Sequence, residues 1–166
     1  MLSDNWKKEA KEQQKTYQHL LKKSNQPSGK KLRNEILHSL PDLHEEAFKK
    51  IDCLECANCC KNYSPRFKQP DIKRIAKRLK IKEGDLINTY LKLDEDNDYV
   101  TKSSPCPFLA ADNTCTIYED RPSDCERYPY TDEDVFLNRP ALTLKNVTVC
   151  PISFYVMEQI LVRVGS

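Results

Sequence analysis

The sequence predicts a mainly α-helical fold with a small irregular β part. Apolar residues recur at helical spacing in several segments, and polar or proline-containing stretches separate those segments. The chain has eight cysteines, and four of them fall within residues 53–60. We therefore expect a compact helical domain with metal-binding cysteine loops and a helical extension at its N-terminus.

Composition limits the classes of partner. A chain of 166 residues with 39% hydrophobic and 31% charged residues corresponds to about one domain with a modest core. Its 27 basic and 25 acidic residues leave a net charge of +2, too little to attract nucleic acid or an anionic membrane strongly. The longest apolar run, residues 152–164, is too short to cross a bilayer. We expect neither a nucleic-acid nor a membrane partner.

The N-terminus indicates a cytoplasmic protein. Its first residues lead into a charged helical pattern, without the apolar run and small-residue cleavage site of a secretory signal. In a small secreted protein, eight cysteines would instead suggest a framework of disulfides. The clustered C-x2-C spacing favours metal binding, and the disulfide alternative applies if the protein is exported by another route.

Three helices are expected before the first cysteine. Residues 4–23 form an amphipathic pattern, which the loop 25–29 ends. A second helix is expected over residues 30–39, and Pro41 can open a third because its missing N–H costs nothing in a first turn. We assign residues 1–40 to a helical extension and residues 41–166 to the cysteine-cluster metal-binding domain.

The middle of the chain predicts two amphipathic helices and a hairpin. Pro70 opens a helix with Ile72 and Ile75 on its apolar face, and a second amphipathic segment follows Gly84 with its apolar residues between Leu86 and Leu91. The acidic turn 94–98 then separates two short strand-like segments. The helix pair resembles a helix-turn-helix in outline, although a solvated basic face explains its lysines and arginines more simply.

Three elements are expected in the last third of the chain. Pro122 can start a short helix that carries Cys125. Residues 142–149 alternate imperfectly between apolar and polar, as a strand does, and residues 152–164 form a buried closing helix.

The stretch from Cys53 to Cys60 predicts a metal site. Two successive C-x2-C steps form a turn that directs several thiolates to one point, as in zinc ribbons and iron–sulfur proteins. The side chains of neighbouring Cys59 and Cys60 are expected to diverge, so that one joins a second metal, bridges two metals or remains a buried thiol.

The downstream cysteines can complete the site. Cys106 and Cys150 each precede a proline, which favours a rigid and irregular loop. Spacing alone allows two four-ligand sites, or one site with spare cysteines. The candidate metal ligands are all eight cysteines: Cys53, Cys56, Cys59, Cys60, Cys106, Cys115, Cys125 and Cys150.

The metal is zinc or iron. Zinc favours closed sites of four thiolates, whereas the spacing Cys53-x2-Cys56-x2-Cys59 also matches the first three ligands of a ferredoxin-type iron–sulfur run. All histidines of the chain lie in the N-terminal helices, where we expect surface residues and not ligands: His19, His38 and His44.

Several ordered blocks resemble the CxxCxxCC cysteine-cluster family, also called YkgJ-like. The matching blocks are Cys53 to Cys60, Asp71 to Ala76, Cys106 to Leu109, Cys115 to Pro122, and Cys125 with Tyr128-Pro129. The resemblance covers about residues 50 to 152 and implies chelation of zinc or iron. Two departures are Ala57, where the family often has glycine, and Glu126, where it often has arginine.

Two alternatives from other classes stay open. Some relatives resemble flagellin lysine methylases, which implies an enzyme that uses the cluster for redox chemistry or protein modification. The chain has only three glycines and none forms a cofactor loop, so no catalytic residue can be named. The other alternative is a zinc-stabilised interaction module that uses the basic helix over residues 73–82.

Overall fold

The computed structural model describes residues 4–165 and is mainly helical, with one two-stranded sheet among these residues. The predicted mainly α fold class is confirmed. Contacts divide the chain into two compact units. We call residues 1–52 with 129–166 the terminal unit and residues 53–128 the cysteine unit. The division into a helical extension of residues 1–40 and a metal-binding domain of residues 41–166 stays a prediction.

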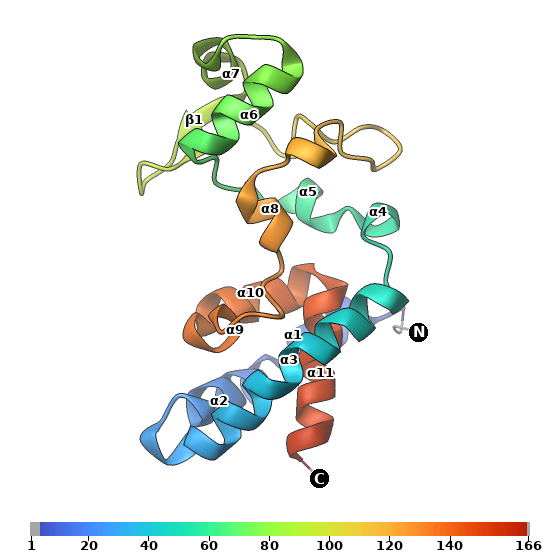
Figure 1. Cartoon of the computed structure of the whole chain (residues 1–166). Helices are drawn as coiled ribbons and strands as arrows, with labels where there is room; N and C mark the ends of the chain where they lie inside the picture. Colours follow the sequence, from blue (N-terminus) through green and yellow to red (C-terminus); the bar gives the residue numbers. More distant parts are fainter. Residues whose placement is uncertain (1–3, 166) are drawn as a thin grey trace. The chain divides into compact units, whose positions relative to one another are not determined.

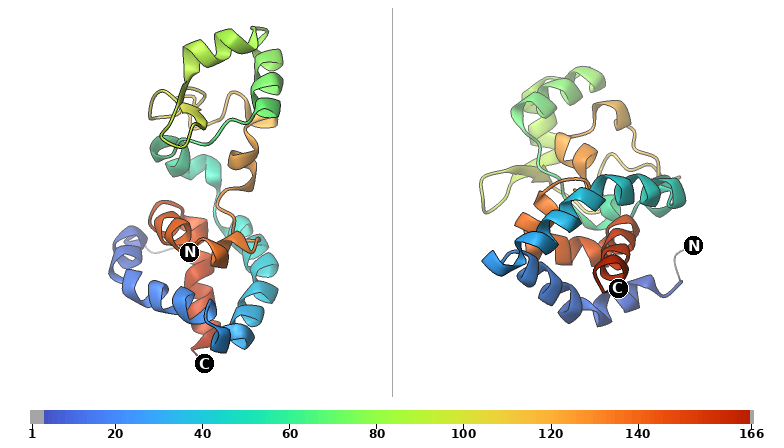
Figure 2. Two further views of the ribbon diagram at one scale, coloured as in Figure 1. Left: turned by 90° about the vertical axis from the view of Figure 1, so that its left-hand side faces the viewer. Right: turned by 60° about the horizontal axis from the view of Figure 1, so that its bottom comes forward.

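The terminal unit is a helical bundle built from both ends of the chain. Its helix α11 packs against α3 and α10, and α10 also contacts α1 and α2 (Figures 1 and 2). The helices are α1 (Trp6–Glu12), α2 (Gln14–Ser24), the 3-10 turn η1 (Pro27–Gly29), α3 (Lys30–Lys50), α9 (Val135–Asn138), α10 (Pro140–Val149) and α11 (Pro151–Val164).

Helix α3 corrects the expectation of two helices that meet at Pro41. It is continuous from Lys30 to Lys50 with Pro41 inside it. Ile36, Leu40, Leu43 and Ala47 are buried at helical spacing across the proline. Burial of this one continuous face offsets the hydrogen bond that proline cannot donate. Phe48, near the end of this helix, is 41% exposed, and its ring packs at a tilt against that of His44.

The C-terminal segments give one correction and one confirmation. Residues 142–149 were expected to form a strand, but they belong to helix α10, which Pro140 opens in its first turn. The alternation of apolar and polar residues comes from a helix that is buried on one side, where Thr143, Asn146 and Val147 lie. The buried closing helix is confirmed as α11.

The cysteine unit consists of short elements around a small core. Strands β1 and β2 pair antiparallel with Leu91 opposite Thr101, so the expected hairpin is confirmed. The expected helix at Pro70 and the one after Gly84 are confirmed as α6 and α7. The elements are α4 (Cys53–Cys56), α5 (Asn58–Asn62), α6 (Gln69–Leu79), α7 (Glu83–Tyr90), β1 (Leu91–Leu93), β2 (Tyr99–Thr101), η2 (Tyr118–Asp120) and α8 (Ser123–Arg127).

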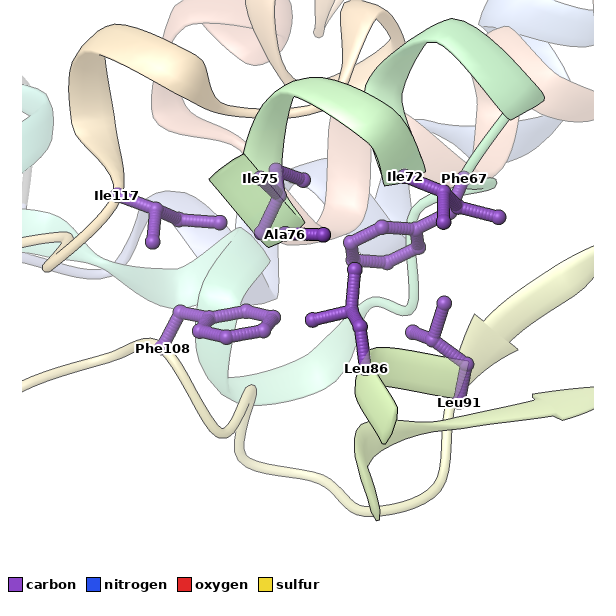
Figure 3. Packing of buried hydrophobic residues seen from close by; sticks show 8 residues of the cluster. All are labelled: Phe67, Ile72, Ile75, Ala76, Leu86, Leu91, Phe108 and Ile117. Atoms are coloured by element: carbon purple, nitrogen blue, oxygen red, sulfur yellow. The ribbon is translucent and has the colours of Figure 1, made fainter. Parts of the chain in front are cut away.

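Figure 3 shows the core of the cysteine unit. Helix α6 supplies three of its buried side chains, α7 and β1 supply Leu86 and Leu91, and loops supply the rest. Cys106 and Cys115 pack against this core. The core therefore supports the loops that carry downstream cysteines. Its members are Phe67, Ile72, Ile75, Ala76, Leu86, Leu91, Phe108 and Ile117.

Among residues 4–165, no single helix is long and apolar enough to cross a membrane. Helices α10 and α11 reach the required length only when taken together, and they are bent by 115° relative to each other.

Replacement of Pro41 tests the account of α3. Pro41→Ala should raise the free energy of unfolding by about 1 to 3 kcal/mol, because alanine restores an N–H donor and removes the clash with the preceding turn. Pro140→Ala is the matched control, since Pro140 lies in the first turn of α10 and should give no gain. Urea denaturation measures both. An equal gain from the two variants would contradict the account.

Candidate metal centre

The cysteine-rich stretch folds as two short helices joined by one left-handed residue. Helix α4 carries Cys53 and Cys56, and α5 carries Cys59 and Cys60. Between them Ala57 has φ 45° and ψ 17°, and it is almost fully buried. The N–H of Ala57 donates to the carbonyl oxygen of Cys53 at 2.9 Å. The left-handed residue thus changes the direction of the chain between the two C-x2-C steps.

The neighbouring thiols of Cys59 and Cys60 lie close together. Their Sγ atoms are 3.9 Å apart and share a hydrogen bond. The expectation that these side chains diverge is therefore wrong. With metal–sulfur bonds of about 2.3 Å, two ligands of a tetrahedral zinc site have sulfurs about 3.8 Å apart. Both thiols are close enough to contact one metal ion.

Backbone contacts bring two downstream cysteines to this segment. The N–H of Cys106 donates to the carbonyl oxygen of Cys60 at 2.8 Å. Cys115 pairs with Leu109 in an isolated β-bridge, in a turn where Asn113 adopts φ 67°. Asparagine tolerates this left-handed conformation better than most residues. The turn thus returns the chain so that Cys115 and Cys106 share one loop structure.

Cys125 is presented by the short helix α8, as the sequence predicts. Pro122 is its N-cap residue, and the N–H of Cys125 donates to the Pro122 carbonyl at 2.9 Å. The preceding residue, Asp124, accepts a hydrogen bond from Arg66 Nε at 2.8 Å. This ion pair joins α8 to the loop before α6.

Four of the thiols have raised pKa values, and their charges influence one another. Burial raises the pKa of Cys125, and negative charge on Cys60, Cys106 and Cys115 raises it further. Burial likewise raises the pKa of Cys115 and raises that of Cys106 to about 11, and Cys60 contributes to both. For Cys60 the hydrogen bond with Cys59 is the largest cause of a raised pKa, followed by burial. We call Cys60, Cys106, Cys115 and Cys125 the thiol cluster.

The thiol cluster has the chemistry of a soft cation site. Thiolates so close together repel one another, and partial burial removes the water that would stabilise them. A bound cation offsets both effects, and thiolate sulfur prefers zinc and iron. Within residues 4–165, however, no group of three or more histidine, cysteine or acidic side chains has metal-holding geometry.

The remaining candidate ligands lie outside the thiol cluster. Cys53 is exposed on α4, whereas Cys56 is half-buried. Cys59 adjoins the cluster through its contact with Cys60. Cys150 belongs to the terminal unit, where it is buried at the start of α11. None of the eight cysteines forms a disulfide in the described part of the chain.

The histidines belong to the terminal unit. His19 and His38 are exposed, as expected. His44 is partly buried, because its Nδ1 lies 2.9 Å from Thr131 Oγ1 and its ring stacks on Phe48.

A family model described as "CxxCxxCC: Putative zinc- or iron-chelating domain" matches residues 52–149, more than half of the chain. The chain belongs to the CxxCxxCC family. No curated protein and no solved structure matches it. The match includes the whole thiol cluster and ends one residue before Cys150.

Sequence reasoning missed the polar residues that hold the CxxCxxCC domain together. Arg66 pairs with Asp124 beside Cys125, and Asp71 accepts hydrogen bonds from Ser123. Asp71 directly follows the helix-opening Pro70, which is a capping signal. That signal predicts a contact with its own helix but not with residues 52 positions away.

Substitution of Ala57 tests the left-handed turn. Ala57→Gly should leave the free energy of unfolding unchanged or raise it by up to about 1 kcal/mol, since glycine adopts positive φ without steric cost. Ala76→Gly, at a buried position inside α6, should lower it by about 1 to 2 kcal/mol. Urea denaturation of both variants makes the comparison. Equal destabilisation would show that Ala57 is not strained.

Proposed function

We propose that the CxxCxxCC domain of this chain binds a zinc or iron ion through the thiolates of Cys60, Cys106, Cys115 and Cys125. The observation that carries the proposal is the grouping of these cysteines: the N–H of Cys106 donates to the carbonyl oxygen of Cys60 at 2.8 Å, and Cys106 and Cys115 pack against one core. The raised pKa of Cys125, caused first by burial and then by the charges of the other three thiols, agrees with this grouping. Four thiolates complete a tetrahedral site, which is the ordinary closed geometry of structural zinc.

The proposed site binds metal with release of protons. The pKa values of all four thiols are raised, so the thiols are protonated at neutral pH before a metal binds. A cation must displace those protons, and its affinity therefore rises with pH. A metal bound by these thiolates would hold α5, the Cys106–Cys115 loop and α8 together. A cytoplasmic location suits the proposal, because reduced thiols are available there.

An iron–sulfur cluster is the alternative form of the same proposal. Cys53, Cys56 and Cys59 keep the spacing of a ferredoxin run, and Cys59 lies 3.9 Å from Cys60, sulfur to sulfur. Cys60 is then the link between the upstream thiols and the thiol cluster. In that form one or more of the upstream cysteines are ligands as well.

No described residue has been identified as catalytic, so the enzyme alternative stays open. The interaction alternative receives less support. On the basic face of α6, Arg74 and Arg78 are paired with Asp71 and Asp120. These pairs reduce the free positive charge that a nucleic-acid interface would need.

Cysteine substitutions test the ligand set. Cys125→Ser and Cys106→Ser should each lower bound zinc or iron at least tenfold in anaerobically purified protein, because each removes one of four thiolates. Elemental analysis measures the metal, and the visible spectrum separates iron from colourless zinc. Cys150→Ser is the matched control and should keep the wild-type metal content.

Other outcomes of the same series are decisive. Wild-type protein without stoichiometric metal would refute the proposal. Loss of metal from Cys53→Ser or Cys56→Ser together with a brown chromophore would favour the iron–sulfur form. Four disulfides in freshly isolated protein, found by mass spectrometry, would favour the disulfide alternative.

Metal removal should loosen the cysteine unit selectively. Seven of the eight cysteines lie in residues 53–128, where the elements are short and depend on contacts between loops. Treatment with a chelator should therefore speed amide hydrogen exchange in α5, the Cys106–Cys115 loop and α8. Amides of α3 and α11 serve as the internal control and should keep their protection. Equal loss of protection in these helices would contradict the prediction.

A further inference from the structure

We propose that Asp71 is a positioning residue of the metal centre, which fixes the start of α8 so that Cys125 faces the other thiols of the cluster. The inference rests on the proposed function, because it assumes that Cys125 is a ligand. Asp71 lies on α6 and is 2% exposed, so its carboxylate depends on protein donors instead of water.

Four donors surround this carboxylate. Oδ1 accepts hydrogen bonds from Arg74 Nη2 at 3.0 Å and from the Ser123 N–H at 3.2 Å. Oδ2 accepts from the Lys68 N–H at 3.0 Å and from Ser123 Oγ at 3.3 Å. Each carboxylate oxygen thus accepts one hydrogen bond from α6 or its N-cap residue and a second one from Ser123. The carboxylate is saturated, and no other ligand is needed to explain its burial.

The same contacts make Asp71 a cap for two helices. Lys68 is the N-cap residue of α6, and Ser123 is the first residue of α8. A negative charge at a helix N-terminus satisfies free N–H groups and opposes the positive end of the helix dipole. Helix α8 has only five residues and is too short to be stable alone. Its position therefore depends on such external contacts.

Two further contacts hold the backbone next to Cys125. Arg74 Nη2 donates to the carbonyl oxygen of Arg121 at 2.8 Å as well as to Asp71, and so joins the carboxylate to the residue before Pro122. Arg66 binds the buried carboxylate of Asp124. The residues one and two positions before Cys125 are thus both anchored, one by Arg66 and the other by Asp71.

Loss of the Asp71 charge should act on the metal through Cys125. An amide at this position cannot accept from four donors, so Ser123 and the start of α8 lose their anchor. Cys60, Cys106 and Cys115 do not depend on α8 for their backbone hydrogen bonds and should remain in place. Residues that orient metal ligands without contacting the metal typically contribute 10- to 100-fold to affinity.

The test uses Co²⁺ as a spectroscopic probe of thiolate ligation in the full-length reduced protein. Asp71→Asn should bind Co²⁺ about 10 to 100 times more weakly than wild type. At saturation, its sulfur-to-cobalt charge-transfer absorbance should fall by about a quarter, as expected when one of four thiolates is lost. Ser123→Ala removes only the Oγ contact and should give a smaller loss of affinity.

The matched control is Leu40→Ala, which destabilises the core of the terminal unit from helix α3 and leaves the loops with the thiols untouched. It should lower the midpoint of thermal unfolding at least as much as Asp71→Asn but keep the full absorbance at saturation. An equal fall in absorbance in the two variants would show that Asp71 acts only on stability and would overturn the inference.

The remaining outcomes separate this inference from the proposed function. Wild type without a thiolate-to-cobalt band refutes the proposed function itself. Wild type with the band, together with Asp71→Asn of unchanged affinity and absorbance, refutes only the role of Asp71. If Asp71→Asn does not fold, Ser123→Ala decides, and wild-type affinity in that variant overturns the inference.

Discussion

The partial burial of four thiols near one another is the constraint on which the cysteine unit depends. Cys60, Cys106, Cys115 and Cys125 each have a raised pKa, because burial and neighbouring sulfur disfavour the thiolate. Neutral thiols can occupy such a place, and thiolates can do so only with a cation between them. The local structure thus links the protonation of the thiols, the binding of metal and the cohesion of the surrounding loops.

The rest of the unit serves to bring these thiols together. The helices α4, α5 and α8 are four or five residues long, and none of them could be stable in isolation. A core built on α6 supports the loop with Cys106 and Cys115, and buried carboxylates anchor α8. Apolar packing and charged hydrogen bonds therefore position different cysteines. This division explains why a small core suffices for the CxxCxxCC domain.

Local patterns predicted elements well where one signal was dominant. The Pro70 helix, the hairpin around the acidic turn and the helix at Pro122 follow from proline positions and from alternation over a few residues. The prediction failed where packing overrode a local signal. Pro41 lies inside α3, because burial of one apolar face of this helix outweighs the hydrogen bond that proline cannot donate. The helix therefore continues through residue 40 and does not end there. The apparent strand over residues 142–149 was wrong because α10 buries one of its faces.

The sequence by itself determined the type of chemistry. The spacing of Cys53, Cys56, Cys59 and Cys60, with four cysteines downstream, is that of the CxxCxxCC family, whose description is a zinc- or iron-chelating domain, and thiolate sulfur is a ligand type that suits both metals. Only the tertiary structure decided which thiols are neighbours, and that Asp71 reaches Ser123. Such groupings depend on loops that pack across more than 50 residues, and neither residue type nor periodicity encodes contacts at that range.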